Sequence, residues 1–151
     1  LMKKFISWEE IDTLVDSLSA QIILDCKKNG TTPKERYKGI YALQRGGLIP
    51  GVMLSHRLDI PMIDRLQSYY GREFLIIDDI ADTGETLSHM RAEVFRTART
   101  ATLHYHRQSK VVPNFWVDEK GDDWIVYPWE KSDSEEIQDY LKEKKNEAVL
   151  S

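Results

Sequence analysis

The stretch Phe74-Leu-Ile-Ile-Asp-Asp-Ile-Ala-Asp-Thr-Gly-Glu-Thr-Leu87 decides how the chain is organised. An apolar run from Phe74 to Ile77 meets two adjacent carboxylates, Asp78 and Asp79, and Asp82 follows in a turn. Such a run is the most strand-like segment of the chain. Adjacent carboxylates repel each other and are costly to bury, so we expect this strand end to face a hydrated site that compensates their charge.

Strand and helix patterns alternate on both sides of this stretch. Ser7 and Glu10 predict a capping box at the start of a helix that ends at Asn29-Gly30. After it we expect strands at 39–43, 60–64, 74–78 and 100–105, and helices at 48–58 and 86–97. Segments 115–117 and 124–127 are expected to form a hairpin-like pair. The alternation predicts an α/β fold with a mostly parallel sheet flanked by helices.

Chain length predicts one domain over residues 1–151, with a core at about 7–130. The charge-rich tail, 131–151, is expected to be helical. The formal net charge of -4 argues against general binding of nucleic acid, which needs a basic surface. A single cysteine, Cys26, cannot form an internal disulfide, and we expect it to be an ordinary thiol on the packed side of a helix.

The beginning of the sequence, Leu-Met-Lys-Lys-Phe-Ile-Ser-Trp-Glu-Glu, contains no signal-peptide core, and no apolar run approaches the length of a membrane span. With one cysteine and no such segment, we expect a cytoplasmic protein that has no membrane partner.

The ends of two predicted strands carry the chemistry, because ligands of open α/β sheets bind beyond the carboxyl ends of the strands. From Asp82 to Thr86 the chain offers successive N–H groups and hydroxyls at a helix start, which suits a phosphate. Gly84 allows that phosphate to approach closely. Asp78 and Asp79 can accept hydrogen bonds from a diol, and one of them can face a divalent cation.

A second anion site is predicted at Gln44-Arg45-Gly46-Gly47, where a guanidinium stands beside exposed backbone N–H groups. Two anion sites beside a diol site describe a sugar with phosphate at one end and pyrophosphate at the other. An isolated acidic pair could be only a helix-capping turn, and an isolated Arg-Gly-Gly is weak evidence. We base the interpretation of a sugar phosphate site on the presence of both motifs, in this order, in one chain.

The run Ile-Asp-Asp-Ile-Ala-Asp-Thr-Gly-Glu resembles the phosphoribosyl pyrophosphate (PRPP) motif of type I phosphoribosyltransferases. Gln-Arg-Gly-Gly-Leu-Ile-Pro-Gly and Trp-Ile-Val-Tyr-Pro-Trp-Glu look most like bacterial xanthine–guanine and related hypoxanthine enzymes. The resemblance covers Ser7 to about Glu130. It implies a Mg²⁺-dependent glycosyltransferase of purine salvage that makes a nucleoside 5′-monophosphate and pyrophosphate from PRPP and guanine, xanthine or hypoxanthine. It also implies a type I fold with a small hood from the C-terminal part, and a homo-oligomer, dimer or tetramer.

The same resemblance implies roles for individual residues. Asp78 and Asp79 would bind the ribose hydroxyls, with Asp79 nearer the Mg²⁺, and Asp82 would act as the base near purine N7. The remaining PRPP ligands would be Arg45, Gly46 and Gly47 for pyrophosphate, where the family often has a non-proline cis peptide, and Ala81, Thr83, Gly84, Glu85 and Thr86 around the 5′-phosphate. On the base side, Trp124 would stack on the purine, Ile125 would read its edge through backbone groups, and His106 would stand where the family normally has a lysine.

Two departures from the family leave alternatives open. Only Arg65 to Glu73 separate two predicted strands where the family usually has a long mobile loop. His106 can donate or accept one hydrogen bond, or can be purely structural, so the choice of base is open. The alternative function is therefore a weakly catalytic or non-catalytic regulatory module that binds PRPP or a nucleotide on the same scaffold.

Overall fold

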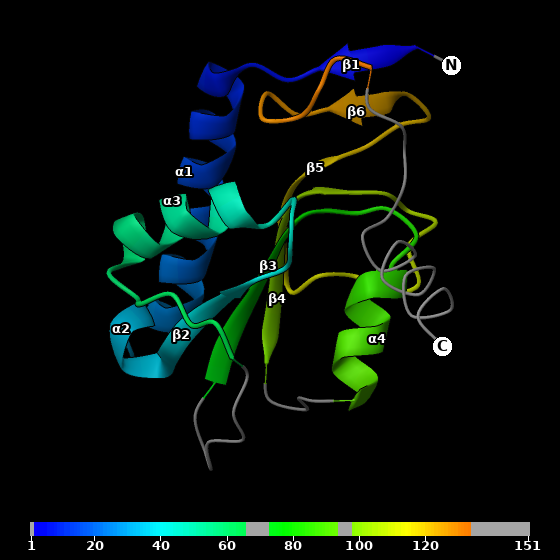
Figure 1. The fold of residues 1–151 in the computed structure, drawn as a ribbon. Coiled ribbons are helices and arrows are strands. Elements are labelled where there is room, and N and C mark those ends of the chain that lie inside the picture. Colours follow the sequence, from blue (N-terminus) through cyan, green and yellow to red (C-terminus); the bar gives the residue numbers. More distant parts are fainter. Residues whose placement is uncertain (1, 66–72, 94–97, 134–151) are drawn as a thin grey trace.

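Two parallel sheets organise the computed structural model, which describes residues 2–65, 73–93 and 98–133 (Figure 1). The larger sheet has the strand order β2 (Tyr37–Ala42), β3 (Glu73–Ala81), β4 (Arg99–Tyr105) and β5 (Phe115–Glu119). The smaller sheet pairs β1 (Lys3–Phe5) with β6 (Trp124–Val126). The predicted α/β class with a mostly parallel sheet is confirmed.

Helices cover both faces of the larger sheet, with α1 (Trp8–Lys28) and α3 (Leu48–Leu58) on one side and α4 (Glu85–Glu93) on the other (Figure 1). Alternate residues of β3 therefore enter two cores. Leu75 and Ile77 join the cluster made with α1 and α3, whereas Ile76 joins the cluster that contains Leu87 of α4. Burial on both faces explains why this strand is apolar without alternation.

The N-terminal helix begins and ends where the sequence predicts. The Ser7 side chain accepts from the Glu10 N–H at 3.1 Å, which completes one half of the capping box. At the other end Asn29 caps the helix and Gly30 adopts a φ of 71°, the left-handed conformation that glycine tolerates best. Cys26 is buried and unoxidised in the packed face of this helix, as expected.

One strand prediction was wrong, and another was too short. Residues 60–64 do not form a strand: only Met62 makes an isolated bridge to Ile40. Pro61 has no N–H to donate, and its carbonyl only accepts from Ile40 N–H at 2.9 Å. In contrast, β3 extends past residue 78 to Ala81, because β4 continues to pair with it as far as Tyr105.

The hairpin predicted from 115–117 and 124–127 was also wrong. β5 runs parallel to β4, with Phe115 paired to Ala101 and packed into the α1 core. β6 instead pairs with β1 in the separate small sheet, Ile125 lying opposite Lys4. We call the β1–β6 sheet and the turn to Glu130 the hood; it thus needs an N-terminal strand that the sequence did not suggest.

The short helix α2 (Pro33–Arg36) lies between α1 and β2. Thr32 caps it by accepting from the Glu35 N–H at 3.3 Å, and Pro33 occupies the first helical turn. The last part of the helix predicted at 86–97 and most of the predicted C-terminal helix lie outside the described residues. Within the described ranges, no helix has the length and hydropathy needed to cross a membrane.

Candidate active site

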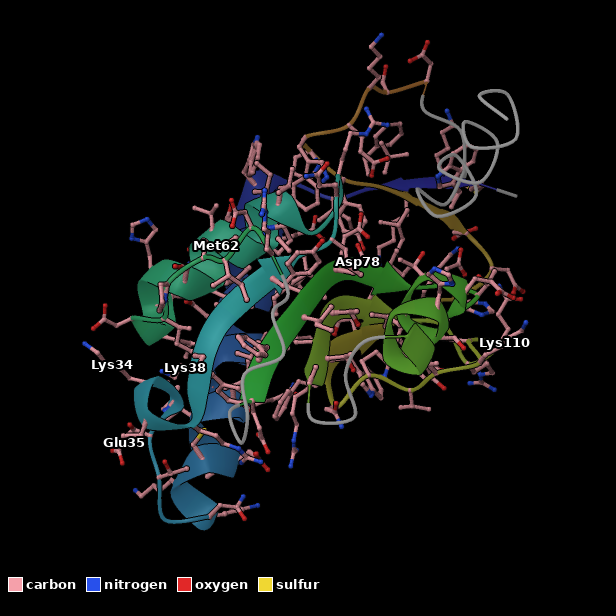
Figure 2. All side chains as sticks on the ribbon, turned by 60° about the horizontal axis from the view of Figure 1, so that its bottom comes forward. Lys34, Glu35, Lys38, Met62, Asp78 and Lys110 are labelled. Atoms are coloured by element: carbon pink, nitrogen blue, oxygen red, sulfur yellow. The ribbon has the colours of Figure 1, made fainter. Side chains whose placement is uncertain are left out.

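Asp78 and Asp79 lie in the final part of β3, beyond the point where β2 stops pairing at Ala42–Ile77. The Asp79 N–H donates to Asp78 Oδ1 at 2.9 Å, and the Ile80 N–H donates to Asp79 Oδ1 at 2.7 Å. Both side chains are half-buried. Each carboxylate thus satisfies a backbone donor of the next residue, which lets an acidic pair continue the strand. Asp78 lies at this end of β3 in Figure 2.

The predicted Arg45 loop packs directly against this acidic pair. The Gln44–Arg45 peptide bond is cis, as the resemblance implies. A Cβ on Gly46 would lie 2.1 Å from Asp79 Oδ2, and a Cβ on Gly47 would lie 2.2 Å from the Ile77 carbonyl oxygen. Only glycine fits at either position. The two strand ends singled out in the sequence are therefore joined by backbone-to-side-chain contact.

The turn after β3 leads into α4 as predicted. Gly84 has a φ of 81°, and a Cβ there would lie 2.7 Å from the Lys110 backbone nitrogen. Thr83 Oγ1 accepts from the Glu85 N–H at 3.3 Å, while the Thr83 carbonyl oxygen accepts from the Lys110 N–H at 2.9 Å. The turn is thus braced from behind by the segment that follows β4. The Lys110 side chain pairs with the Glu85 carboxylate.

Asp82 is buried, and two side chains that the sequence reasoning missed hold its carboxylate. Gln108 Nε2 donates to Asp82 Oδ1 at 3.1 Å, and Lys120 Nζ donates to Asp82 Oδ2 at 3.1 Å. Gln108 follows β4 and Lys120 follows β5. Both stand at the carboxyl ends of parallel strands, where the rule that located Asp78 also applies. Gln108 follows a strand that was predicted, whereas Lys120 follows β5, which was not recognised as a parallel strand.

His106 lies in the same loop as Gln108, and its backbone pairs with Ala81, the residue before Asp82. Its backbone N–H donates to the Ala81 carbonyl oxygen at 2.9 Å, and its Nδ1 accepts from the Gln108 N–H at 3.1 Å. Because Nδ1 accepts, the neutral ring carries its proton on Nε2. That atom is 4.0 Å from Asp122 Oδ1.

Trp124 and Ile125 lie in β6 of the hood. Lys3 of β1 places its Nζ 5.2 Å from the centroid of the Trp124 ring, a cation–π contact that covers one face of the indole. Ile125 is buried, and its backbone pairs with Lys4. Both residues follow the loop that carries Lys120, so the hood and the Asp82 carboxylate are connected by a short piece of chain.

Comparison with known proteins assigns these elements to one family. The model of the phosphoribosyl transferase domain matches residues 63–135. A xanthine-guanine phosphoribosyltransferase of Nitratidesulfovibrio vulgaris is 30% identical over 145 residues, 83% of this chain and 83% of the relative. The chain belongs to the phosphoribosyltransferase family.

Two further relatives agree. A xanthine-guanine phosphoribosyltransferase of Idiomarina loihiensis is 29% identical over 147 residues, 83% of this chain and 86% of the relative. The crystal structure of a purine phosphoribosyltransferase from Pyrococcus horikoshii superimposes with a TM-score of 0.70 at 28% identity, covering 91% of this chain and 100% of that one. The type I fold expected from the sequence is thereby confirmed.

A buried hydrogen-bond chain links the hood of this phosphoribosyltransferase to its acidic pair. The Tyr127 hydroxyl donates to the Asp79 carbonyl oxygen at 3.2 Å and lies 2.8 Å from His104 Nδ1. Since the hydroxyl proton is directed at Asp79, His104 donates from Nδ1. Burial lowers the pKa of His104 to about 4, which keeps the ring neutral near pH 7, and raises the pKa of Tyr127. No motif in the sequence indicates a role for His104.

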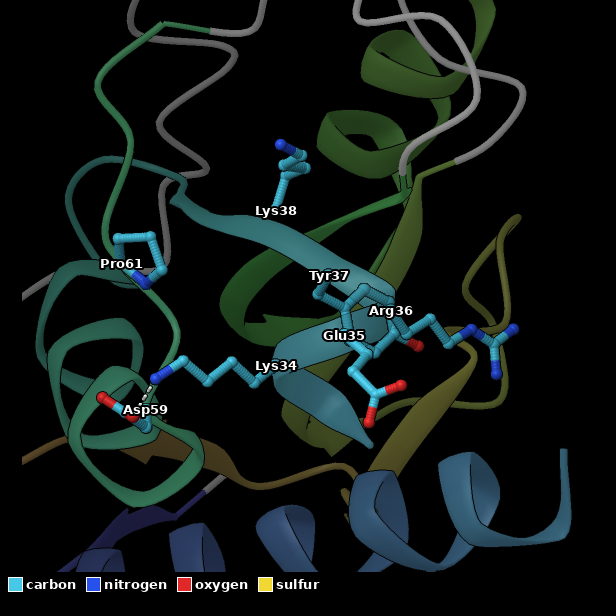
Figure 3. Close-up of a pocket in the computed structure, with 7 residues that line it drawn as sticks. All are labelled: Lys34, Glu35, Arg36, Tyr37, Lys38, Asp59 and Pro61. Carbon is cyan, nitrogen blue, oxygen red and sulfur yellow. Dashed lines mark hydrogen bonds and ion pairs between the residues drawn. The ribbon is translucent and has the colours of Figure 1, made fainter. Parts of the chain in front are cut away.

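An open hollow of about 520 Å³ lies away from these residues, at the amino end of β2 (Figure 3). It is lined by Lys34, Glu35, Arg36, Tyr37, Lys38, Asp59 and Pro61. Lys34 crosses it to pair with Asp59 at 2.8 Å. The hollow and the Arg45 loop lie at opposite ends of β2, and we assign the hollow no part in the candidate active site.

Proposed function

We propose that this phosphoribosyltransferase makes a nucleoside 5′-monophosphate and pyrophosphate from PRPP and a 6-oxopurine, namely guanine, xanthine or hypoxanthine. The observation that carries the proposal is the contact between Gly46 and the Asp79 carboxylate. It brings a predicted pyrophosphate loop against a predicted ribose site, as a substrate with phosphate groups at both ends requires. The names of the relatives support purines as the acceptor class.

In this proposal PRPP lies along the carboxyl ends of β2 and β3. Arg45, Gly46 and Gly47 bind the pyrophosphate group through a guanidinium and backbone donors. Asp78 and Asp79 accept hydrogen bonds from the ribose hydroxyls. The turn at the N-terminus of α4 binds the 5′-phosphate with residues Ala81, Asp82, Thr83, Gly84, Glu85 and Thr86.

The acidic pair also fits Mg²⁺. Among the described residues, no group of three or more His, Cys, Asp or Glu is arranged to hold a metal ion alone. Mg²⁺ is commonly held by one or two carboxylates together with substrate oxygens and water, and Asp79 with Asp78 supplies that set. When bound with PRPP, the ion would neutralise charge on the departing pyrophosphate.

The base would lie under the hood. Trp124 offers the indole face that Lys3 does not cover for stacking, Ile125 offers backbone groups to the purine edge, and His106 lies at its margin. Asp82 takes the proton from N7 as N9 forms its bond to C1 of the ribose. The bond from C1 to the pyrophosphate oxygen breaks, and its electron pair leaves with pyrophosphate. Positioning supplies much of the rate in such a transfer.

The relatives named above are transferases, which does not favour the alternative of a binding-only module. We also propose that the protein acts in the cytoplasm and, as the family resemblance implies, that it forms a homo-oligomer.

The test is a panel of guanine, xanthine, hypoxanthine and adenine, each incubated with PRPP and Mg²⁺, with nucleotide and pyrophosphate quantified. We expect turnover with at least one 6-oxopurine, and none after Mg²⁺ is chelated. PRPP-dependent thermal stabilisation without turnover of any base would instead establish the binding-only alternative. Neither stabilisation nor turnover would refute both functions.

A further inference from the structure

Lys120 is a buried ammonium for which the fold alone gives no reason. Its side chain is 6% exposed, and its Nζ lies 3.1 Å from the Asp82 carboxylate, which is 10% exposed. Lysine is almost never this buried unless it is paired. A buried ion pair usually adds little stability compared with apolar residues of the same size, because both charges lose their hydration. A role other than stability therefore deserves a test.

The Lys120 side chain is not needed to hold the end of β5 against the loop after β4, because other contacts already join these two segments. Arg107 Nε donates to Glu119 Oε1 at 2.8 Å between the same two segments, with side chains 81% and 41% exposed. The Lys120 backbone N–H also donates to the Tyr105 carbonyl oxygen at 2.7 Å. The connection between the segments thus does not depend on the ammonium.

The pair presents a hydrogen-bond acceptor and a donor side by side at the proposed base site. Asp82 offers a carboxylate, whereas the ammonium of Lys120 can only donate. A 6-oxopurine carries a carbonyl oxygen next to N7, and a 6-aminopurine carries a donating NH₂ group in the same place. A lysine ammonium at this point can donate to the carbonyl oxygen of a 6-oxopurine, but it disfavours the donating NH₂ group of a 6-aminopurine.

We propose that Lys120 is the specificity-determining residue for the base: its ammonium donates to the 6-oxygen of the purine while the N7 proton passes to Asp82. This inference rests on the proposed function and adds the residue that selects the base. It also supplies a cation to this site from the end of β5. Donation to the 6-oxygen withdraws electron density from the purine and makes N7–H more acidic.

The experiment compares Lys120→Met and Lys120→Arg with the wild type, using hypoxanthine and adenine as acceptors at saturating PRPP and Mg²⁺. Arg107→Gln is the matched control, because it breaks an ion pair between the same two segments. We expect Lys120→Met to lower kcat/KM for hypoxanthine by about 10- to 100-fold, the effect of losing one good base contact, with little change for adenine. Lys120→Arg should retain part of the preference. Arg107→Gln should leave the ratio of the two bases unchanged.

Equal losses with both bases would overturn the proposal, and so would a change of the base ratio in Arg107→Gln. Should the wild type turn over no base at all, the proposed function fails separately, and binding of IMP and AMP by calorimetry decides the inference. In that assay Lys120→Met must weaken IMP binding but not AMP binding. Should Lys120→Met fail to fold, Lys120→Leu, which also removes the donor, replaces it with the same two outcomes.

Discussion

Acidification should destabilise this protein through His104 in a way that a single substitution removes. The ring is 3% exposed, and burial lowers its pKa from the ordinary value of 6.5 to about 4. Between these two values the unfolded chain binds a proton that the folded chain does not, so stability falls as pH falls. A shift of this size corresponds to about 3 kcal/mol when complete, of which about 2 kcal/mol is lost between pH 7 and pH 4.5.

The variant His104→Phe keeps an aromatic ring but cannot titrate. At pH 7 it should be less stable than the wild type by about 1 kcal/mol, because the Tyr127 hydroxyl loses its donor. On acidification the difference in unfolding free energy between the two proteins should close and then reverse. Only the wild type loses stability through protonation of His104 in the unfolded chain, whereas protonation of the carboxylates affects both proteins alike.

Urea unfolding followed by tryptophan fluorescence at several pH values measures the difference directly, provided that the slopes agree. His56→Gln is the control, because His56 lies on the exposed side of α3 and its loss should leave the pH dependence of the wild type unchanged. A His104→Phe curve parallel to the wild type from pH 7 to pH 4.5 would refute the assignment of a neutral, proton-excluding His104.

Three further substitutions test the site. Asp82→Asn should lower kcat by about 100-fold or more, with PRPP affinity changed only a few-fold in a calorimetric titration; near-wild-type turnover would remove Asp82 from the role of base. Gly46→Ala should abolish PRPP binding and destabilise the fold by about 1–3 kcal/mol, because the new methyl group meets the Asp79 carboxylate at 2.1 Å. Gly121→Ala, with no atom within 4 Å of the added Cβ, should change neither quantity. Trp124→Ala should raise KM for the base at least 10-fold and leave KM for PRPP nearly unchanged, and an equal rise in both would argue against stacking on the purine.

The parts of the fold that were predictable are those whose signals are local. The capping box of Ser7 and Glu10 and the apolar run of β3 both report their structure over a few neighbouring residues. The helix Leu48–Leu58 was located for the same reason, with Pro50 accepted in its first turn. A prediction from sequence succeeds where propensity, capping and burial agree within a single segment.

Elements that depend on a distant partner were missed. β1 is a strand of three exposed residues, Lys3–Phe5, and exists only because β6 pairs with it across almost the whole chain. The direction of β5 likewise depends on β4 and on the α1 core rather than on its own residues. Segment 60–64 reads as a strand by composition, yet Pro61 removes a donor and leaves one bridge.

The site follows the same division, and this bears on how its chemistry is divided. Asp78, Asp79 and Asp82 lie in one motif and Arg45 lies in another, so the half of the site that we propose for PRPP can be recognised in the sequence. Lys120 reaches Asp82 only because β5 is the parallel neighbour of β4, so its carboxyl end lies at the same edge as that of β3. A search for sequence motifs alone finds His106 where the family normally has a lysine, and would count the cation as lost. The sheet topology brings the ammonium of Lys120 to the Asp82 carboxylate from another strand. In our proposal, therefore, the cation that selects the base does not have to stand at position 106.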